Sequence, residues 1–213
     1  RSVILCLGFP NLEAKNSKDV SNTEVKKKTI SHKKKYSLNL VNSKDGHPVR
    51  SGKKSYRFEV RLGDCGKDSG HDDCKKDRQR TELQFKKHQM GKKDHWYSAS
   101  IYLPEDYQSV APVRTTFAQL YEKGWKPILM VTDRSGEWLE VGRMWSGEYV
   151  EMKKAIRIND MRGKWTDVLI NARYSREENG FIKVWINNQL ILNAENIKNI
   201  TPYTKRGVGL DFG

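Results

Sequence analysis

Apolar and polar residues alternate along most of the chain after residue 36. In SYRFEVRLG, residues 55–63, charged side chains fall on one face of an extended segment, and apolar side chains fall on the other. A period of two is typical of half-buried β-strands. The same pattern recurs, with turn residues between, in YSLNLV, RTELQF, HWYSASIYLP, RTTFAQLYE, KPILMVT, GEWLEVG and AIRIND. Only EDYQSV, residues 105–110, has room for a helical turn.

A hairpin is the clearest local prediction. Residues 163–197, GKWTDVLINARYSREENGFIKVWINNQLILNAENI, contain a strand, a turn in which Gly180 is free to take positive φ, a return strand and a second tight turn at NN. Many short alternating strands separated by turns predict an all-β fold, a two-sheet antiparallel β-jelly-roll sandwich of concanavalin-like type.

The first 35 residues differ in composition from the rest of the chain. Residues 1–14, RSVILCLGFPNLEA, have the basic residue, apolar run and small residue of a signal-peptide remnant, although an ordinary strand is the alternative. Residues 15–35 are polar with two lysine clusters, which is typical of a basic linker or disordered arm. We therefore expect one jelly-roll domain over residues 36–213, in a secreted or periplasmic protein.

The net charge of the chain limits the chemical class of its partner. The chain has 213 residues with 40 Lys and Arg against 26 Asp and Glu, a formal charge of +14. Such an excess favours an anionic partner, namely nucleic acid, an acidic lipid surface or an acidic polysaccharide. Six Trp and nine Tyr suit sugar rings and bases equally. No apolar run is long enough for a membrane-spanning helix.

Three cysteines are present, and the first lies in the N-terminal apolar segment. Cys65 and Cys74 close a short polar loop, CGKDSGHDDC. A disulfide fits an exported protein. Two free thiols are a second interpretation, and a metal site with His71, Asp72 and Asp73 is a third, although this spacing matches no closed zinc template.

The segment QRTELQF raises the main chemical question. Arg80 and Glu82 stand two residues apart, so a strand would point both to one face and point Thr81, Leu83 and Phe85 to the other. The modest interpretation is a solvated face with an ion pair. The sharper interpretation is a groove that binds a negatively charged ligand.

The order of several segments resembles a known family. GKKSYRFEVR, QRTELQF, HWYSASIYLP, FAQLYEK, GKWTDVLINARYS, NGFIKVWINN and YTKRGV follow one another as in the jelly-roll polysaccharide lyases of the heparin lyase I and glucuronan lyase group, and more distantly the alginate lyases. The likeness covers roughly residues 36–212. It implies a substrate groove across a concave sheet, and cleavage of a uronic-acid-containing polysaccharide by β-elimination.

This reaction sets clear requirements. The C5 proton of a uronate becomes acidic only when the neighbouring carboxylate is neutralised, for which an arginine and an amide side chain are suited. A base then takes the C5 proton, and an acid, often a tyrosine, protonates the departing O4. No redox cofactor is needed, and we expect no bound metal in catalysis.

By position, the resemblance makes Arg80 and Gln119 the carboxylate-neutralising groups. Glu82 would hold Arg80 in place. Lys205 and Tyr203, from the Tyr-x-Lys-x-Gly pattern near the C-terminus, would bind substrate.

The sequence departs from the family pattern at two positions. The histidine of Gln-x-His is Tyr121, and the last tyrosine of the C-terminal pattern is Gly209. Tyr121 could act as the base if nearby cations lower its pKa. His47, in the loop DGHPV, could instead supply the imidazole. A third interpretation is a fragment that lacks a late strand.

Further substrate contacts are expected on the hairpin. Arg173, Lys183, Trp185 and Asn187 alternate with apolar residues, and we predict that they share the concave face with the reacting groups. Relatives often carry structural calcium, so a calcium ion is an option without assigned ligands. The expected partner is an acidic polysaccharide bound by a monomer, with no nucleic acid and no membrane.

Other function classes remain open. A lectin-like jelly roll that binds a polyanionic glycan without cutting it would explain the two departures. A nucleic-acid-binding protein is suggested by charge alone, since no recognised reader motif is present. A glucanase would need two carboxylates close together on one strand face, which EVGRMWSGE and REENG do not provide.

Overall fold

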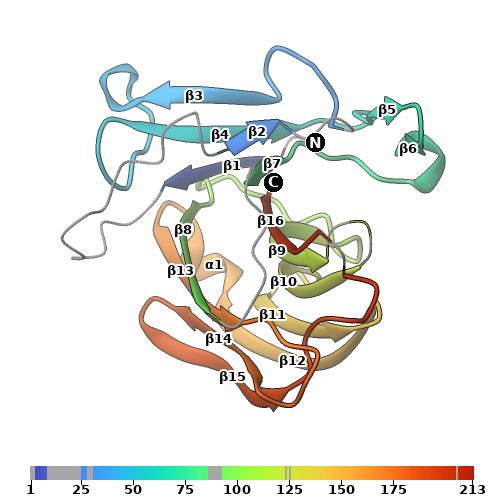
Figure 1. Ribbon diagram of the computed structural model, residues 1–213. Coiled ribbons are helices and arrows are strands. Elements are labelled where there is room, and N and C mark those ends of the chain that lie inside the picture. Colours follow the sequence, from blue (N-terminus) through green and yellow to red (C-terminus); the bar gives the residue numbers. More distant parts are fainter. Residues whose placement is uncertain are drawn as a thin grey trace.

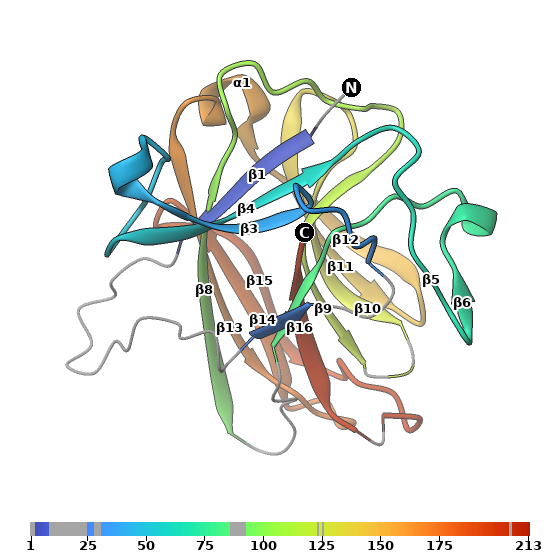
Figure 2. The ribbon, with the colours of Figure 1, turned by 90° about the horizontal axis from the view of Figure 1, so that it is seen from above.

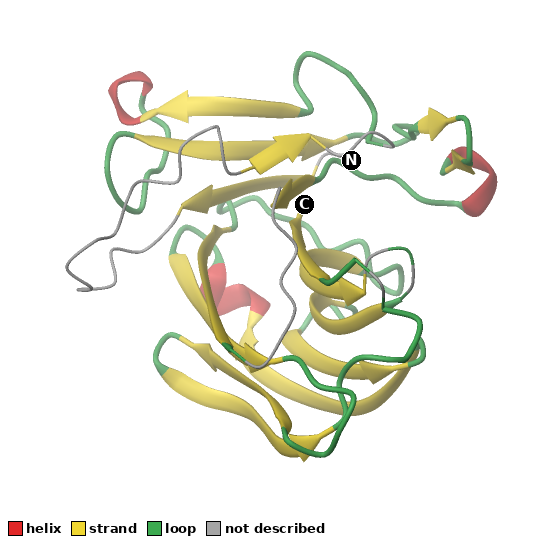
Figure 3. Ribbon diagram, viewed as in Figure 1, coloured by secondary structure: helices red, strands yellow, loops and turns green. Residues whose placement is uncertain are grey.

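The computed structural model describes residues 3–8, 25–27, 31–85, 93–122, 124, 126–204 and 206–213. Nearly all of the regular structure is β (Figure 3). The elements are β1 (Val3–Gly8), β2 (Val25–Lys27), β3 (Leu38–Asn42), η1 (Ser43–Asp45), β4 (Lys54–Val60), β5 (Lys67–Asp68), β6 (His71–Asp72), η2 (Cys74–Lys76), β7 (Leu83–Phe85), β8 (Asp94–Tyr102), β9 (Thr115–Glu122), β10 (Pro127–Asp133), β11 (Trp138–Trp145), β12 (Glu148–Arg157), α1 (Ile158–Met161), β13 (Trp165–Arg173), β14 (Gly180–Ile186), β15 (Gln189–Ile197) and β16 (Val208–Phe212).

Two seven-stranded antiparallel sheets form a sandwich (Figure 1). Sheet A has the order β15-β14-β13-β8-β1-β4-β3, and sheet B has the order β12-β11-β10-β9-β16-β7-β2. The C-terminal strand β16 lies between β9 and β7 in sheet B (Figure 2). The predicted all-β sandwich is confirmed.

One hydrophobic core fills the space between the sheets. Ile101 and Val184 from sheet A and Leu120 and Leu210 from sheet B belong to a single buried cluster. Since side chains alternate across a strand, the residues between these positions lie on the two outer faces of the sandwich. The predicted alternation therefore places the core correctly, except at Leu62, which follows the end of β4 and is 84% exposed.

Two described segments before residue 36 are strands of the sheets, and residues 15–24 and 28–30 of the predicted linker lie outside the described residues. Val3–Gly8 forms β1, between β4 and β8 in sheet A, as in the alternative of an ordinary strand. Val25–Lys27 forms β2, which pairs with β7 at the edge of sheet B.

The prediction of a linker or disordered arm over residues 15–35 is wrong for Ser31 and His32, because both side chains are buried. Ser31 Oγ accepts a hydrogen bond from the Glu82 backbone N–H at 3.0 Å. Polar contacts of this kind leave no trace in a hydrophobic pattern, so this segment resembled a linker.

Candidate active site

Three neighbouring strands of sheet B carry polar side chains on the outer face. Asp211 on β16 pairs with Gln84 on β7 and with Gln119 on β9. These three residues therefore form one row across the sheet, because directly paired residues point to the same face. Their neighbours in sequence enter the core instead: Leu83, Leu120 and Leu210.

Asp211 is the centre of this row and is only 1% exposed. The Nε2 group of Gln84 donates to Oδ1 at 3.3 Å, and the Nε2 group of Gln119 donates to Oδ2 at 3.4 Å. One carboxylate therefore orients two carboxamides, one from each neighbouring strand.

Tyr121 lies on the same face, beside Gly209 in the register of β9 and β16. Its phenol oxygen accepts a hydrogen bond from Gln84 Nε2 on β7. The ring thus crosses β16 at a position that has no side chain. Burial, together with the carboxylates of Asp211 and Glu82, raises the pKa of Tyr121. The hypothesis that cations lower this pKa and create a base is wrong, because the phenol stays protonated at neutral pH.

Arg80 precedes β7 and shares its outer face with Glu82. The guanidinium donates to Asp73 through Nε at 3.0 Å and NH2 at 2.6 Å, and to Glu82 through NH1 at 3.2 Å. Each terminal nitrogen keeps a second N–H. The side chain is 19% exposed, so part of it reaches solvent. Burial lowers the pKa of Arg80, but the hydrogen bond to Asp73 and the charges of Glu82, Asp73 and Asp211 outweigh it and raise the pKa. Arg80 precedes β7 and Gln119 lies on β9, so the two residues belong to the strands that flank the strand of Asp211.

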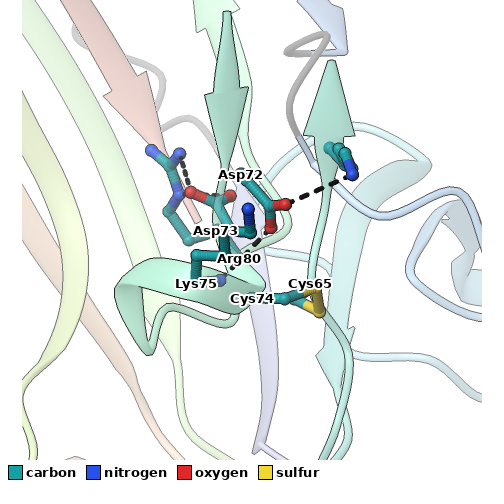
Figure 4. The surroundings of a disulfide bond; sticks show 7 residues. Cys65, Asp72, Asp73, Cys74, Lys75 and Arg80 are labelled. Carbon is teal, nitrogen blue, oxygen red and sulfur yellow. Dashed lines mark hydrogen bonds and ion pairs between the residues drawn. A yellow bond between two sulfur atoms is a disulfide. The ribbon is translucent and has the colours of Figure 1, made fainter. Parts of the chain in front are cut away.

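The predicted disulfide is present and supports this arginine. Cys65 and Cys74 are bonded, with Cα atoms 5.2 Å apart, and they enclose the hairpin β5–β6. Asp73 directly precedes Cys74, and its backbone N–H donates to Gly66 O at 2.9 Å. Figure 4 shows Asp73 and Arg80 facing each other beside the disulfide. The loop closed by the disulfide therefore positions the Asp73 carboxylate, which orients Arg80.

The C-terminal motif is anchored from β9. Glu122 is 1% exposed and accepts hydrogen bonds from the backbone N–H and hydroxyl of Thr201 and from the hydroxyl of Thr204. Tyr203, between these threonines, is 68% exposed. Its predicted substrate contact stays a prediction, and Lys205 lies outside the described residues.

The structure does not bring His47 to the site. His47 lies in the loop between β3 and β4, and nearby Arg50 donates two hydrogen bonds to Asp167 on the outer face of sheet A, at 3.0 and 2.8 Å. Within the described residues, His32 is the histidine that contacts the Arg-Thr-Glu segment, with Nε2 2.8 Å from Thr81 Oγ1. Because Thr81 points inward, His32 lies behind the site.

The basic residues of the hairpin are on the opposite side of the molecule. Arg173 and Lys183 belong to β13 and β14 of sheet A and point away from the core. Each has an ion-pair partner, Asp94 for Arg173 and Glu195 for Lys183. The prediction that these residues share a face with Arg80 is wrong.

Trp185 and Asn187 are likewise far from the site. Trp185 stacks on Trp96 across the outer face of sheet A, with ring centroids 5.9 Å apart. Asn187 has a φ of 48° in the turn between β14 and β15, and its Oδ1 accepts from the Asp167 backbone N–H at 2.8 Å. Its role in the structure is to form a turn, for which asparagine is suited.

Sequence reasoning missed Gln84, Asp211 and Asp73. Gln84 continues the alternation of Arg80 and Glu82, so the same pattern could have identified it. Asp211 stands between apolar residues in VGLDF, which signals a polar outward position without indicating its neighbours. The link from Asp73 to Arg80 depends on a loop conformation and has no sequence signal.

Two searches of the described part of the chain were negative. None of its helices has the length and apolar character required to cross a membrane. No three His, Cys, Asp or Glu side chains converge there in an arrangement able to hold a metal ion.

Comparisons with known proteins agree with this fold. A model of the polysaccharide lyase family matches residues 20–209. Among solved structures, the chain is similar to an endo-β-1,4-glucuronan lyase from the fungus Trichoderma reesei, with a TM-score of 0.61 and 14% identity over 87% of this chain and 81% of that one. A search of curated proteins found no match. At this identity the structural likeness establishes the jelly-roll fold.

Proposed function

The chain belongs to the polysaccharide lyase family, and we propose that it cleaves an acidic, uronic-acid-containing polysaccharide of glucuronan type by β-elimination. The observation that carries the proposal is that Gln119 and Tyr121 on β9 share the outer face of sheet B with Arg80, which precedes β7, and that these two strands flank the strand of Asp211. An arginine and carboxamides suit neutralisation of the substrate carboxylate, and a protonated phenol suits the acid of this elimination.

Arg80 and Gln119 would bind the substrate carboxylate. The guanidinium has accessible N–H groups, and its own charge is held in place by Asp73 and Glu82. Charge-assisted hydrogen bonds from such a preorganised donor stabilise the doubly charged aci-anion more than the singly charged ground state. The C5 proton can then pass to a general base, a role that neither Arg80 nor the protonated Tyr121 fills, as the C4–C5 double bond forms.

Tyr121 would protonate the departing O4. Its raised pKa keeps the proton on the phenol, so the residue is an acid over the neutral range. The C4–O4 bond breaks as the oxygen takes this proton, which leaves an unsaturated sugar at the new end.

We further propose a secreted or periplasmic monomer. The Cys65–Cys74 disulfide is stable in oxidising compartments, and the formal charge of +14 attracts a polyanion.

The test is incubation with glucuronan, alginate, heparin and hyaluronan, with the ultraviolet absorbance of the unsaturated product as readout. We expect a rise with glucuronan, and a loss of about a hundredfold or more in kcat/KM for Arg80→Lys. Arg50→Lys is the matched control, because Arg50 also forms an ion pair with a carboxylate, that of Asp167, but on sheet A. A flat trace on every substrate together with retained binding would indicate a lectin instead.

A further inference from the structure

The outer face of sheet B continues beyond the reacting groups. Gln119 pairs with Met130 on β10, and Met130 pairs with Gly142 on β11. Tyr149 covers this part of the face. A Cβ at Gly142 would lie 2.4 Å from Tyr149 Cε1, and the Tyr149 hydroxyl is 3.6 Å from Met130 Sδ. Tyr149 therefore lies on the same face as Gln119, and glycine at 142 allows it to lie flat against the sheet.

Two arginines are held around this tyrosine. Arg114 NH1 donates to the Tyr149 hydroxyl at 3.2 Å. Arg134 lies over the ring, with Cζ 5.0 Å from the centroid. Both side chains are exposed, so the tyrosine orients two guanidinium groups toward solvent above the sheet.

Neither of these two arginines has an ion-pair partner in the described residues, which is also true of Arg78, Arg157, Arg162, Arg176 and Arg206. Ion pairs neutralise six arginines: Arg50, Arg57, Arg61, Arg80, Arg143 and Arg173. In the part of the chain that the structure describes, Arg114 and Arg134 have no carboxylate at ion-pair distance. Their positive charge is therefore available to a ligand, whereas most of the charge of Arg80 is compensated by Asp73 and Glu82.

We infer that Arg114 and Arg134 form a second carboxylate subsite, which binds a further uronate of the same polymer chain as the one held at Arg80. Gly142 is two strands from β9 and four strands from β7, which follows Arg80, so the second subsite lies about 10 Å from Gln119 and about 19 Å from the strand of Arg80 at the usual strand spacing. A guanidinium binds a carboxylate in planar, bidentate geometry. This inference rests on the proposed function and adds that the protein recognises two acidic sugars of its substrate at once.

The test is the double variant Arg114→Gln, Arg134→Gln on polyglucuronate. We expect KM to rise about tenfold, with kcat within about twofold, because the lost contacts bind substrate and transition state equally. Direct binding should weaken by the same factor and depend less on salt. Tyr149→Phe keeps the ring and loses the hydroxyl that orients Arg114, so its KM should rise less, about twofold to threefold.

The control is Lys44→Gln, Lys164→Gln, which removes the same charge from exposed positions in connections of sheet A. If the arginine variant matches this control, the subsite is refuted while cleavage by the wild type still supports the proposed function. If the wild type binds polyglucuronate without cleaving it, the proposed function fails, and the affinities of the two double variants still decide the subsite. A wild type that does not bind the polymer contradicts both proposals.

Discussion

The buried carboxylate of Asp73 binds the guanidinium of Arg80 on the side that faces away from solvent. The carboxylate takes two hydrogen bonds from the guanidinium, at 3.0 and 2.6 Å, and is itself 0% exposed, whereas the arginine side chain is 19% exposed. A ligand on the outer face can therefore reach the arginine but not the carboxylate that orients it. Asp73 is a positioning residue, and the disulfide at Cys74 fixes its place in the chain.

Asp73→Asn should therefore reduce both stability and turnover. The substitution leaves Arg80 partly buried without its main counter-charge, which costs about 3 kcal/mol in the free energy of unfolding. We also expect kcat/KM to fall about tenfold or more, because the guanidinium loses its orientation. Denaturant unfolding and initial rates measure the two effects.

Asp94→Asn is the matched control for that change. Asp94 also pairs with an arginine, Arg173, but both side chains are about two-fifths exposed, at 42% and 41%. Exposed pairs contribute about 1 kcal/mol or less, and this pair lies on sheet A. Equal losses of stability and activity in the two variants would contradict the positioning role of Asp73.

Removal of the disulfide should act through the same carboxylate. Cys65→Ser, Cys74→Ser opens a loop with a sequence separation of 9, and loops of this size contribute about 2–3 kcal/mol. We expect this loss together with a fall in kcat/KM, and reduction of the wild type with a thiol should reproduce both. A reduced wild type with full activity would show that the β5–β6 loop holds Asp73 without its cross-link.

The alternation of side chains along each strand predicted which residues face the core. Arg80 and Glu82 point outward, and Thr81 and Leu83 point inward, as their spacing indicates. The spacing also predicts that Gln119 and Tyr121 share one face. These inferences depend only on the period of two, which the backbone imposes locally.

The sequence did not reveal which outer face a strand contributes to. Arg173 and Lys183 have the same alternation as Gln119 and Tyr121, but β13 pairs with β8 in sheet A, and β9 pairs with β16 in sheet B. Pairing between distant segments decides the sheet, and a single strand carries no signal for it. The roles of Asp211 and His32 depend on the same long-range pairing.

Tyr121→Phe tests the proposed acid. The variant retains the ring and loses the proton, so we expect kcat to fall about a hundredfold to ten-thousandfold with little change in the melting temperature. An acid acts only while it is protonated. Since the pKa of Tyr121 is raised above 10.0, the wild-type rate should show no alkaline limb from this group below about pH 10. A pH–rate profile of kcat/KM measures this, and a limb at lower pH that vanishes in the variant would contradict the raised pKa.

Asp211→Asn should shift that limb. The Asp211 carboxylate is the largest contributor after burial to the raised pKa of Tyr121, so its neutralisation lowers the pKa toward the ordinary value. We expect the alkaline limb of the profile to move to lower pH. The asparagine retains a carbonyl oxygen for Gln84 and a shape that fits the row, so folding is checked by the melting temperature. If the alkaline limb stays at the same pH in a folded variant, the Asp211 carboxylate does not raise the pKa of the catalytic acid.

The lowered pKa of His32 makes the free energy of unfolding depend on pH. Burial lowers the pKa of His32 below 6.5, although the nearby Asp64 carboxylate opposes the shift. The unfolded chain then binds a proton near its ordinary pKa while the folded imidazole is still neutral. The free energy of unfolding should therefore fall as the pH drops from about 7 toward the lowered pKa. His32→Gln should flatten this slope, and His95, whose pKa burial also lowers, should account for part of what remains. Denaturant unfolding at a series of pH values measures the slope, and a wild-type slope retained in His32→Gln would show that His32 titrates alike in both states.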